Sequence, residues 1–178
     1  YPFLREKIVN DRAVRLLAVE PAATPSITRG EYAFDYGDTG QMAPIVKMHT
    51  LGHDFIPAKI HAGGLRYHGM APSLSALCDA GYIDAVAVHQ KSVFDAAVLF
   101  AQSEVVIPAP ESSHAIRAAV DEALKAKETG EKKVILFNLS GHGHFDLSAY
   151  EAYLGGDLED YDYPEGAIAT IKDRLPKV

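Results

Sequence analysis

Short apolar runs alternate with helix-like segments along this chain, and that alternation restricts its fold more than any other feature. The apolar runs cover residues 14–19, 83–88, 105–107 and 134–139, and the last of these is apolar at five of its six positions. Helices are predicted over residues 71–80, 92–102 and 113–128, where apolar residues recur every three or four positions. Alternating strands and helices form right-handed βαβ units. We therefore predict a three-layer α/β fold, with a mainly parallel twisted sheet and helices on both faces.

The composition narrows the class of protein. The 178 residues are 48% hydrophobic, which is enough apolar surface to bury a core. The formal charge of −7 argues against a nucleic-acid or anionic-membrane partner. No apolar run approaches the roughly 18–20 residues that a membrane helix needs. The single cysteine, Cys78, suits a reducing compartment, so we expect a cytoplasmic protein.

The chain is expected to divide into one domain and a tail. Residues 1–154 hold the alternating segments, together with a long irregular excursion over residues 24–60. Residues 155–178 are rich in acidic side chains and have no basic residue before Lys172, which predicts a solvated, loosely held tail. The chain begins without a methionine, and we expect it to be part of a longer polypeptide.

Two loops that follow predicted strands are candidate ligand sites, because ligands of parallel sheets bind beyond the carboxyl ends of the strands. In residues 140–146, Gly141 allows a ligand to approach the backbone and Ser140 presents a hydroxyl. The alternative is a simple glycine turn into a helix that Asp146 caps. His142 and His144 have a spacing that suits a metal, but no third ligand follows from it.

The second loop, Pro-Ala-Pro-Glu-Ser-Ser-His over residues 108–114, precedes a predicted helix. Ser112 and Ser113 suit helix caps, and Glu111 suits the positive end of the helix dipole. The functional alternative is that the Glu111 carboxylate faces a ligand. Residues 61–69 contain three glycines, which allow backbone carbonyls to turn toward a ligand or cation. These patterns alone indicate an α/β ligand-binding domain.

Four strings carry a resemblance to a known family. They are Leu-Ala-Val-Glu-Pro at 17–21, His-Ala-Gly-Gly-Leu at 61–65, Ile-Pro-Ala-Pro-Glu-Ser-Ser-His-Ala at 107–115 and Asn-Leu-Ser-Gly-His-Gly at 138–143. In this order they resemble the C-terminal half of the tryptophan synthase β chain over about residues 1–154, nearer to its divergent second group. The resemblance implies a pyridoxal-phosphate lyase of fold-type II in tryptophan biosynthesis, which makes L-tryptophan from L-serine and indole.

The resemblance also implies roles for particular residues. Ser140 matches the neutral hydroxyl that faces the pyridine nitrogen of the cofactor, with Gly141 beside it. Gly64 matches the backbone that lines the cofactor cleft. Glu111 matches the acidic catalytic residue beside the cofactor ring, where it assists proton movements around the substrate.

The segment over residues 65–69 matches the family's monovalent-cation loop, which implies a cation held by the carbonyls of Tyr67 and Gly69. Here the sequence departs from the common β chains. Arg66 replaces an aspartate that helps to close the active site, so closure must differ. His68 and Gly69 alter the cation loop itself.

The family's Schiff-base lysine, in a His-Lys pair, and its glycine-rich phosphate cup are absent from these residues. We therefore expect a fragment that is inactive alone and needs the N-terminal half, in a parent enzyme that is a homodimer. The residues leave open whether an α subunit binds and whether the donor is L-serine or a phosphorylated serine. Two alternatives also stay open: another fold-type II lyase, such as serine or threonine dehydratase or threonine synthase, and a non-catalytic ligand-binding α/β domain.

Overall fold

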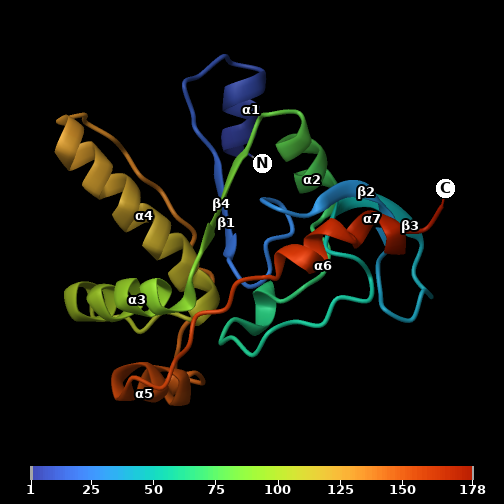
Figure 1. Ribbon diagram of the computed structural model, residues 1–178. Helices are drawn as coiled ribbons and strands as arrows, with labels where there is room; N and C mark the ends of the chain where they lie inside the picture. Colours follow the sequence, from blue (N-terminus) through green and yellow to red (C-terminus); the bar gives the residue numbers. More distant parts are fainter. Residues whose placement is uncertain (1, 178) are drawn as a thin grey trace.

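The computed structural model describes residues 2–177 and contains two small sheets with helices around them (Figure 1). Strand β1 (Leu17–Pro21) pairs in parallel with β4 (Asp84–Val88), with Leu17 opposite Asp84 and Pro21 opposite Val88. Strands β2 (Glu31–Tyr36) and β3 (Ile45–Thr50) form an antiparallel hairpin between them in the chain. The predicted mixed α/β fold with a parallel sheet is confirmed.

The helices include the three that the periodicity predicted, close to their expected bounds. They are α1 (Pro2–Ile8), the 3-10 turn η1 (Gly63–Leu65), α2 (Pro72–Asp79), α3 (Gln90–Glu104), α4 (Pro110–Thr129), α5 (Leu147–Gly155), α6 (Glu165–Ala169) and α7 (Ile171–Arg174). Helix α4 begins three residues earlier than predicted because proline, with its fixed φ, is suited to the first helical position. Among the described residues, no helix is long and apolar enough to cross a membrane.

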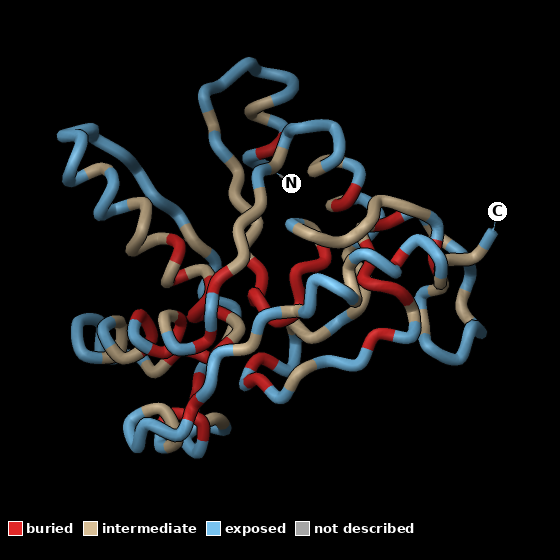
Figure 2. Tube along the Cα trace, in the orientation of Figure 1, coloured by how far each residue is buried: buried red, intermediate tan, exposed pale blue. Residues whose placement is uncertain are grey.

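Two predicted strands, at 105–107 and 134–139, are not formed. Val105 instead ends α3 in the left-handed region, with φ of 60°, and only an isolated bridge joins Pro108 to His142. After α4 the chain runs back without pairing, and Figure 2 shows this segment exposed. Val134 is 100% exposed and Leu136 is 72% exposed. A strand needs a hydrogen-bonded neighbour, and none of the described strands pairs with this segment.

The core beneath the predicted ligand loops is built by α3 and α5. Phe94 and Ala97 of α3 pack against Ala149 and Tyr150 of α5. The Tyr150 hydroxyl donates a hydrogen bond of 2.6 Å to the Pro108 carbonyl, and burial raises the pKa of Tyr150 to about 12. This bond ties the loop before α4 to the core.

The C-terminal segment is packed, so the expectation that it is loosely held is wrong. Leu158 joins the core of α3 and α5 and is 5% exposed. Ile171 is completely buried against Leu51 and Phe55. The acidic residues lie on the outside of this segment, while the apolar residues between them bury against the rest of the chain.

Candidate functional site

Three segments that are distant in the sequence meet at one place. The Gly64 N–H in η1 donates to Glu111 Oε1 at 2.8 Å, in the first turn of α4. The Ser140 N–H donates to Ser112 Oγ at 3.1 Å, and the two serine hydroxyl oxygens also lie 3.1 Å apart. The structure therefore brings together the four residues Gly64, Glu111, Ser140 and Gly141.

Both glycines of this site lie close to other atoms. A Cβ on Gly141 would lie 3.1 Å from the Ala109 Cβ. A Cβ on Gly64 would lie 3.3 Å from Glu111 Cγ and 3.4 Å from Glu111 Oε1. A side chain at either position would crowd α4 or its carboxylate, so the absence of a side chain keeps the site open.

The site faces solvent. Gly64 and Ser140 are exposed, and Glu111 and Gly141 are partly buried. The Ser140 hydroxyl is therefore not enclosed in the hydrophobic interior, and a planar ligand has access to it. A hydroxyl, a carboxylate and glycine backbone at one opening suit a ligand that has both a flat face and a polar edge.

The serines of the Glu-Ser-Ser-His motif are not helix caps, which corrects that alternative. The residue at the N-cap position is Ala109, and no side chain caps α4. The Ser113 hydroxyl donates to the Ala109 carbonyl at 2.8 Å, one turn back. Asp146 does occupy the N-cap position of α5, but its side chain makes no capping hydrogen bond.

His114 is buried beneath this site. It is 2% exposed, and its Nδ1 lies 2.8 Å from the Pro110 carbonyl oxygen. Since a carbonyl only accepts, Nδ1 carries the hydrogen. Burial lowers the pKa of His114, which favours the neutral ring.

This burial predicts an acid sensitivity. Because the folded-state pKa of His114 lies below its unfolded value, its contribution to stability is complete above about pH 6.5 and declines as the pH falls toward the folded pKa. We expect His114→Asn to weaken the loss of unfolding free energy between pH 7.5 and pH 5.5, because asparagine takes up no proton in this range, while its amide can still donate to the Pro110 carbonyl. Urea unfolding at the two pH values measures it, with the exposed His144→Asn as control. An unchanged pH dependence in His114→Asn would contradict the prediction.

Of the two predicted cation residues, Gly69 lies beside strand β3 and Tyr67 is exposed. Gly69 forms an isolated bridge with Thr50, and a Cβ there would lie 2.6 Å from the Met48 sulfur. Tyr67 is 66% exposed. Within residues 2–177, no group of three or more histidine, cysteine or acidic side chains could hold a metal ion. That observation concerns side chains only, so a monovalent cation held by the carbonyls of Tyr67 and Gly69 stays a prediction.

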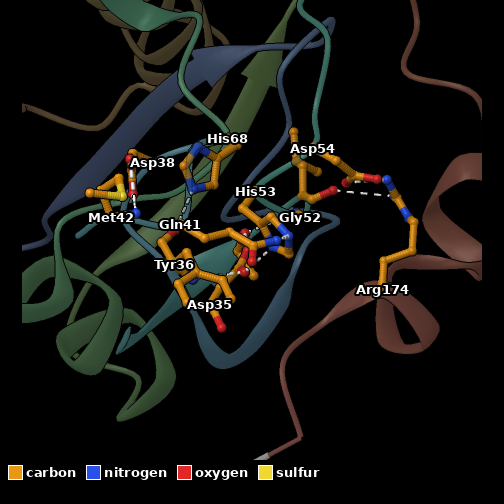
Figure 3. Close-up of polar contacts among 12 residues, drawn as sticks. Asp35, Tyr36, Asp38, Gln41, Met42, Gly52, His53, Asp54, His68 and Arg174 are labelled. Carbon is orange, nitrogen blue, oxygen red and sulfur yellow. Dashed lines mark hydrogen bonds and ion pairs between the residues drawn. The ribbon is translucent and has the colours of Figure 1, made fainter. Parts of the chain in front are cut away.

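Sequence reasoning missed a second polar cluster, at the base of the β2–β3 hairpin (Figure 3). Asp35 is completely buried, and its carboxylate accepts hydrogen bonds from Thr50 Oγ1 at 2.7 Å and the Tyr36 N–H at 2.8 Å. His53 Nδ1 lies 2.7 Å from the same carboxylate, and Gln41 Nε2 lies 3.0 Å from His53 Nε2. Each member is partnered within the cluster, which indicates a structural network.

Comparison with known proteins identifies the class. Residues 2–141 match the family described as "Pyridoxal-phosphate dependent enzyme", and the chain belongs to this family. It is 61% identical over 163 residues to the tryptophan synthase beta chain 2 of Aquifex aeolicus, covering 90% of this chain and 38% of that protein. For the same-named proteins of Methanosarcina mazei and Pyrococcus furiosus, the identities are 59% over 157 residues (88% of this chain, 36% of theirs) and 55% over 176 residues (99% and 40%). The chain thus spans less than half the length of these relatives.

The donor set fits the ring of pyridoxal phosphate. A neutral hydroxyl at Ser140 suits the ring nitrogen, and the backbone at Gly64 and Gly141 leaves room for a flat ring. The Glu111 carboxylate has Oε1 fixed by the Gly64 N–H, which orients its other oxygen.

Proposed function

We propose that this chain is the C-terminal part of a tryptophan synthase β chain, a lyase that replaces the hydroxyl of L-serine with indole to give L-tryptophan and water. We assign residues 1–154 to the domain that binds the cofactor ring and residues 155–178 to an acidic tail, of which Leu158 and Ile171 pack against the rest of the chain. The observation that carries the proposal is the meeting of Gly64, Glu111 and Ser140 at one opening. The identity of 55–61% to proteins of that name supports the choice of reaction.

Pyridoxal phosphate supplies the electron sink of this chemistry when it is bound. Ser140 donates its hydroxyl hydrogen to the ring nitrogen. A neutral hydroxyl does not hold a proton on that nitrogen, unlike a carboxylate, so less charge is drawn into the ring. This suits elimination and replacement at the β carbon of the substrate.

Glu111 moves protons beside the substrate. The Gly64 N–H holds Oε1, so Oε2 would be the oxygen that takes up or returns a proton beside the bound substrate. The same hydrogen bond connects η1 to α4, so the carboxylate and the glycine backbone are positioned together.

The large exposed surface of this chain supports the proposal that the N-terminal half of the β chain packs against it. The accessible surface is 10,538 Å², whereas a compact protein of 19.3 kDa has about 8,500 Å². Val134, Leu136, Leu139 and Phe145 are among the exposed apolar residues near Ser140 in the chain. Large exposed apolar surfaces mark interaction sites. The N-terminal half would cover this surface and supply the Schiff-base lysine and the phosphate cup, in a homodimeric enzyme.

The complete β chain tests the proposed function. Incubated with L-serine and indole, it should form L-tryptophan, measured by chromatography. Pyruvate from L-serine without tryptophan would favour the dehydratase alternative. Neither product, with no cofactor bound, would favour a non-catalytic ligand-binding domain.

The isolated chain carries a separate prediction. Mixed with pyridoxal phosphate, it should form no stable lysine-linked adduct, because the His-Lys pair that holds the family's Schiff-base lysine does not occur in it. Borohydride reduction followed by peptide mass spectrometry measures this, with the complete β chain as the positive control. Stoichiometric labelling of one lysine of the isolated chain would contradict the prediction.

The carbonyls of Tyr67 and Gly69 are kept as the proposed ligands of a monovalent cation. Arg66 directly precedes Tyr67 in the chain, and its Nη1 donates to the Ala58 carbonyl at 3.4 Å. This hydrogen bond attaches the segment over residues 65–69 to the chain before η1.

A further inference from the structure

The two adjacent serines at the start of α4 have different partners, although both are buried. Ser113 is completely buried and donates within its own helix to the Ala109 carbonyl. Ser112 is 2% exposed, and its oxygen is directed at Ser140 of the loop after α4. Ser113 therefore makes its hydrogen bond within the first turn of α4, whereas Ser112 makes its hydrogen bonds to Ser140 of the site.

The hydrogen bonds of Ser112 restrict where its own hydrogen points. Its Oγ accepts the Ser140 N–H, so one lone pair is used. The Ser140 Oγ lies 3.1 Å away and can accept the single hydrogen of Ser112. When Ser112 donates in this way, the Ser140 oxygen acts as an acceptor toward α4 and its own hydrogen is directed outward, to the open side of the site.

We propose that Ser112 is a positioning residue that turns the Ser140 hydroxyl outward as a donor to the ring nitrogen of the cofactor. This inference rests on the proposed function. Without Ser112, the Ser140 hydroxyl is free to rotate and the Ser140 N–H loses its partner. The ring nitrogen then meets either a donor or an acceptor, and an acceptor there favours a protonated ring.

The test compares Ser112→Ala with Ser113→Ala in the complete β chain. Both variants remove a buried hydroxyl from the same turn of α4, but only the first touches Ser140. Ser112→Thr keeps the hydroxyl and serves as the rescue variant. In the protein without cofactor, the Ser140 amide should exchange with solvent faster in Ser112→Ala than in the other two, because its acceptor is lost.

The protein is then loaded with pyridoxal phosphate labelled with ¹⁵N in the ring. The ring-nitrogen chemical shift should move toward that of the protonated ring in Ser112→Ala and stay at the wild-type value in Ser113→Ala and Ser112→Thr. The kcat for tryptophan formation should fall about threefold to tenfold in Ser112→Ala, as expected for one hydrogen bond, with little change in the KM for L-serine.

The outcomes separate this inference from the proposed function. A wild-type protein that binds no cofactor and forms no tryptophan would overturn the proposed function. An active wild type with the same ring-nitrogen shift and kcat in Ser112→Ala would overturn the role of Ser112 alone. Equal losses in Ser112→Ala and Ser113→Ala, with no change in the shift, would show a purely structural role and also overturn it.

Discussion

In the complete β chain, Glu111→Gln should lower kcat for tryptophan formation by about 10²–10⁴-fold, the range typical of removing a general acid or base. In the wild type, the Gly64 nitrogen lies 2.8 Å from Glu111 Oε1. Glutamine keeps an oxygen that can accept the same Gly64 N–H. The connection between η1 and α4 is thus preserved, and only the ability to carry a proton is removed. Steady-state kinetics with L-serine and indole measure the effect.

A matched control for Glu111→Gln lies on the same helix. Glu128 is exposed near the end of α4 and far along the helix from the site, so Glu128→Gln should leave kcat unchanged. Cofactor binding, followed by the visible spectrum, should be retained in both variants. If Glu111→Gln kept the wild-type kcat, Glu111 would be a residue that only holds Gly64 in place.

The sequence predicted that Ser140 and Glu111 lie in ligand loops, and the structure brings these two loops together, although the apolar runs before them form no strands. Ser140 and Glu111 stand where apolar runs end and helices begin, and the resemblance assigned their roles. The partner of Ser140 was not predictable. The sequence suggested that Ser112 caps a helix beginning at Ser113, but α4 begins at Pro110, and only the folded chain shows the Ser112 hydroxyl 3.1 Å from Ser140.

The strand prediction at 134–139 was wrong for a related reason. An apolar pattern records that side chains suit burial, but it does not say which segment covers them. In residues 2–177 no strand pairs with this segment, and Val134 is fully exposed. The prediction for the C-terminal tail was wrong in the opposite direction. The many charged residues of this segment indicated exposure, but Ile171 is completely buried and Leu158 nearly so.

The Asp35 cluster was missed because its members are separated in sequence. Asp35 on β2 meets Thr50 at the end of β3, 15 positions away, and His53 just beyond it, 18 positions away. A lone acidic residue in a short strand is usually exposed. The hairpin register pairs Asp35 with Val46 and Thr50 with Glu31, so strand pairing alone does not predict the contact, and only the folded chain shows these groups around one buried carboxylate.

Replacing Asp35 with asparagine should lower the free energy of unfolding of this chain by about 3 kcal/mol, because a buried hydrogen-bond donor left without its acceptor costs about 1–3 kcal/mol, and more where the acceptor was charged. The hydrogens around this carboxylate explain why the isosteric change is severe. Thr50 Oγ1 accepts the Gly52 N–H at 2.9 Å, so its own hydrogen points to Asp35. His53 Nε2 faces the Gln41 amide nitrogen, which places its ring hydrogen on Nδ1, also toward Asp35.

Together with the Tyr36 N–H, three donors converge on the carboxylate, and an asparagine NH₂ group would meet at least one of them. Asp38 supplies the control, because its partly buried carboxylate caps the Met42 and Ala43 N–H groups of the same hairpin loop. Asp38→Asn should cost about 0.5–2 kcal/mol at most. Urea unfolding compares the two variants, and equal losses would mean that the Asp35 network contributes no more than a surface loop cap.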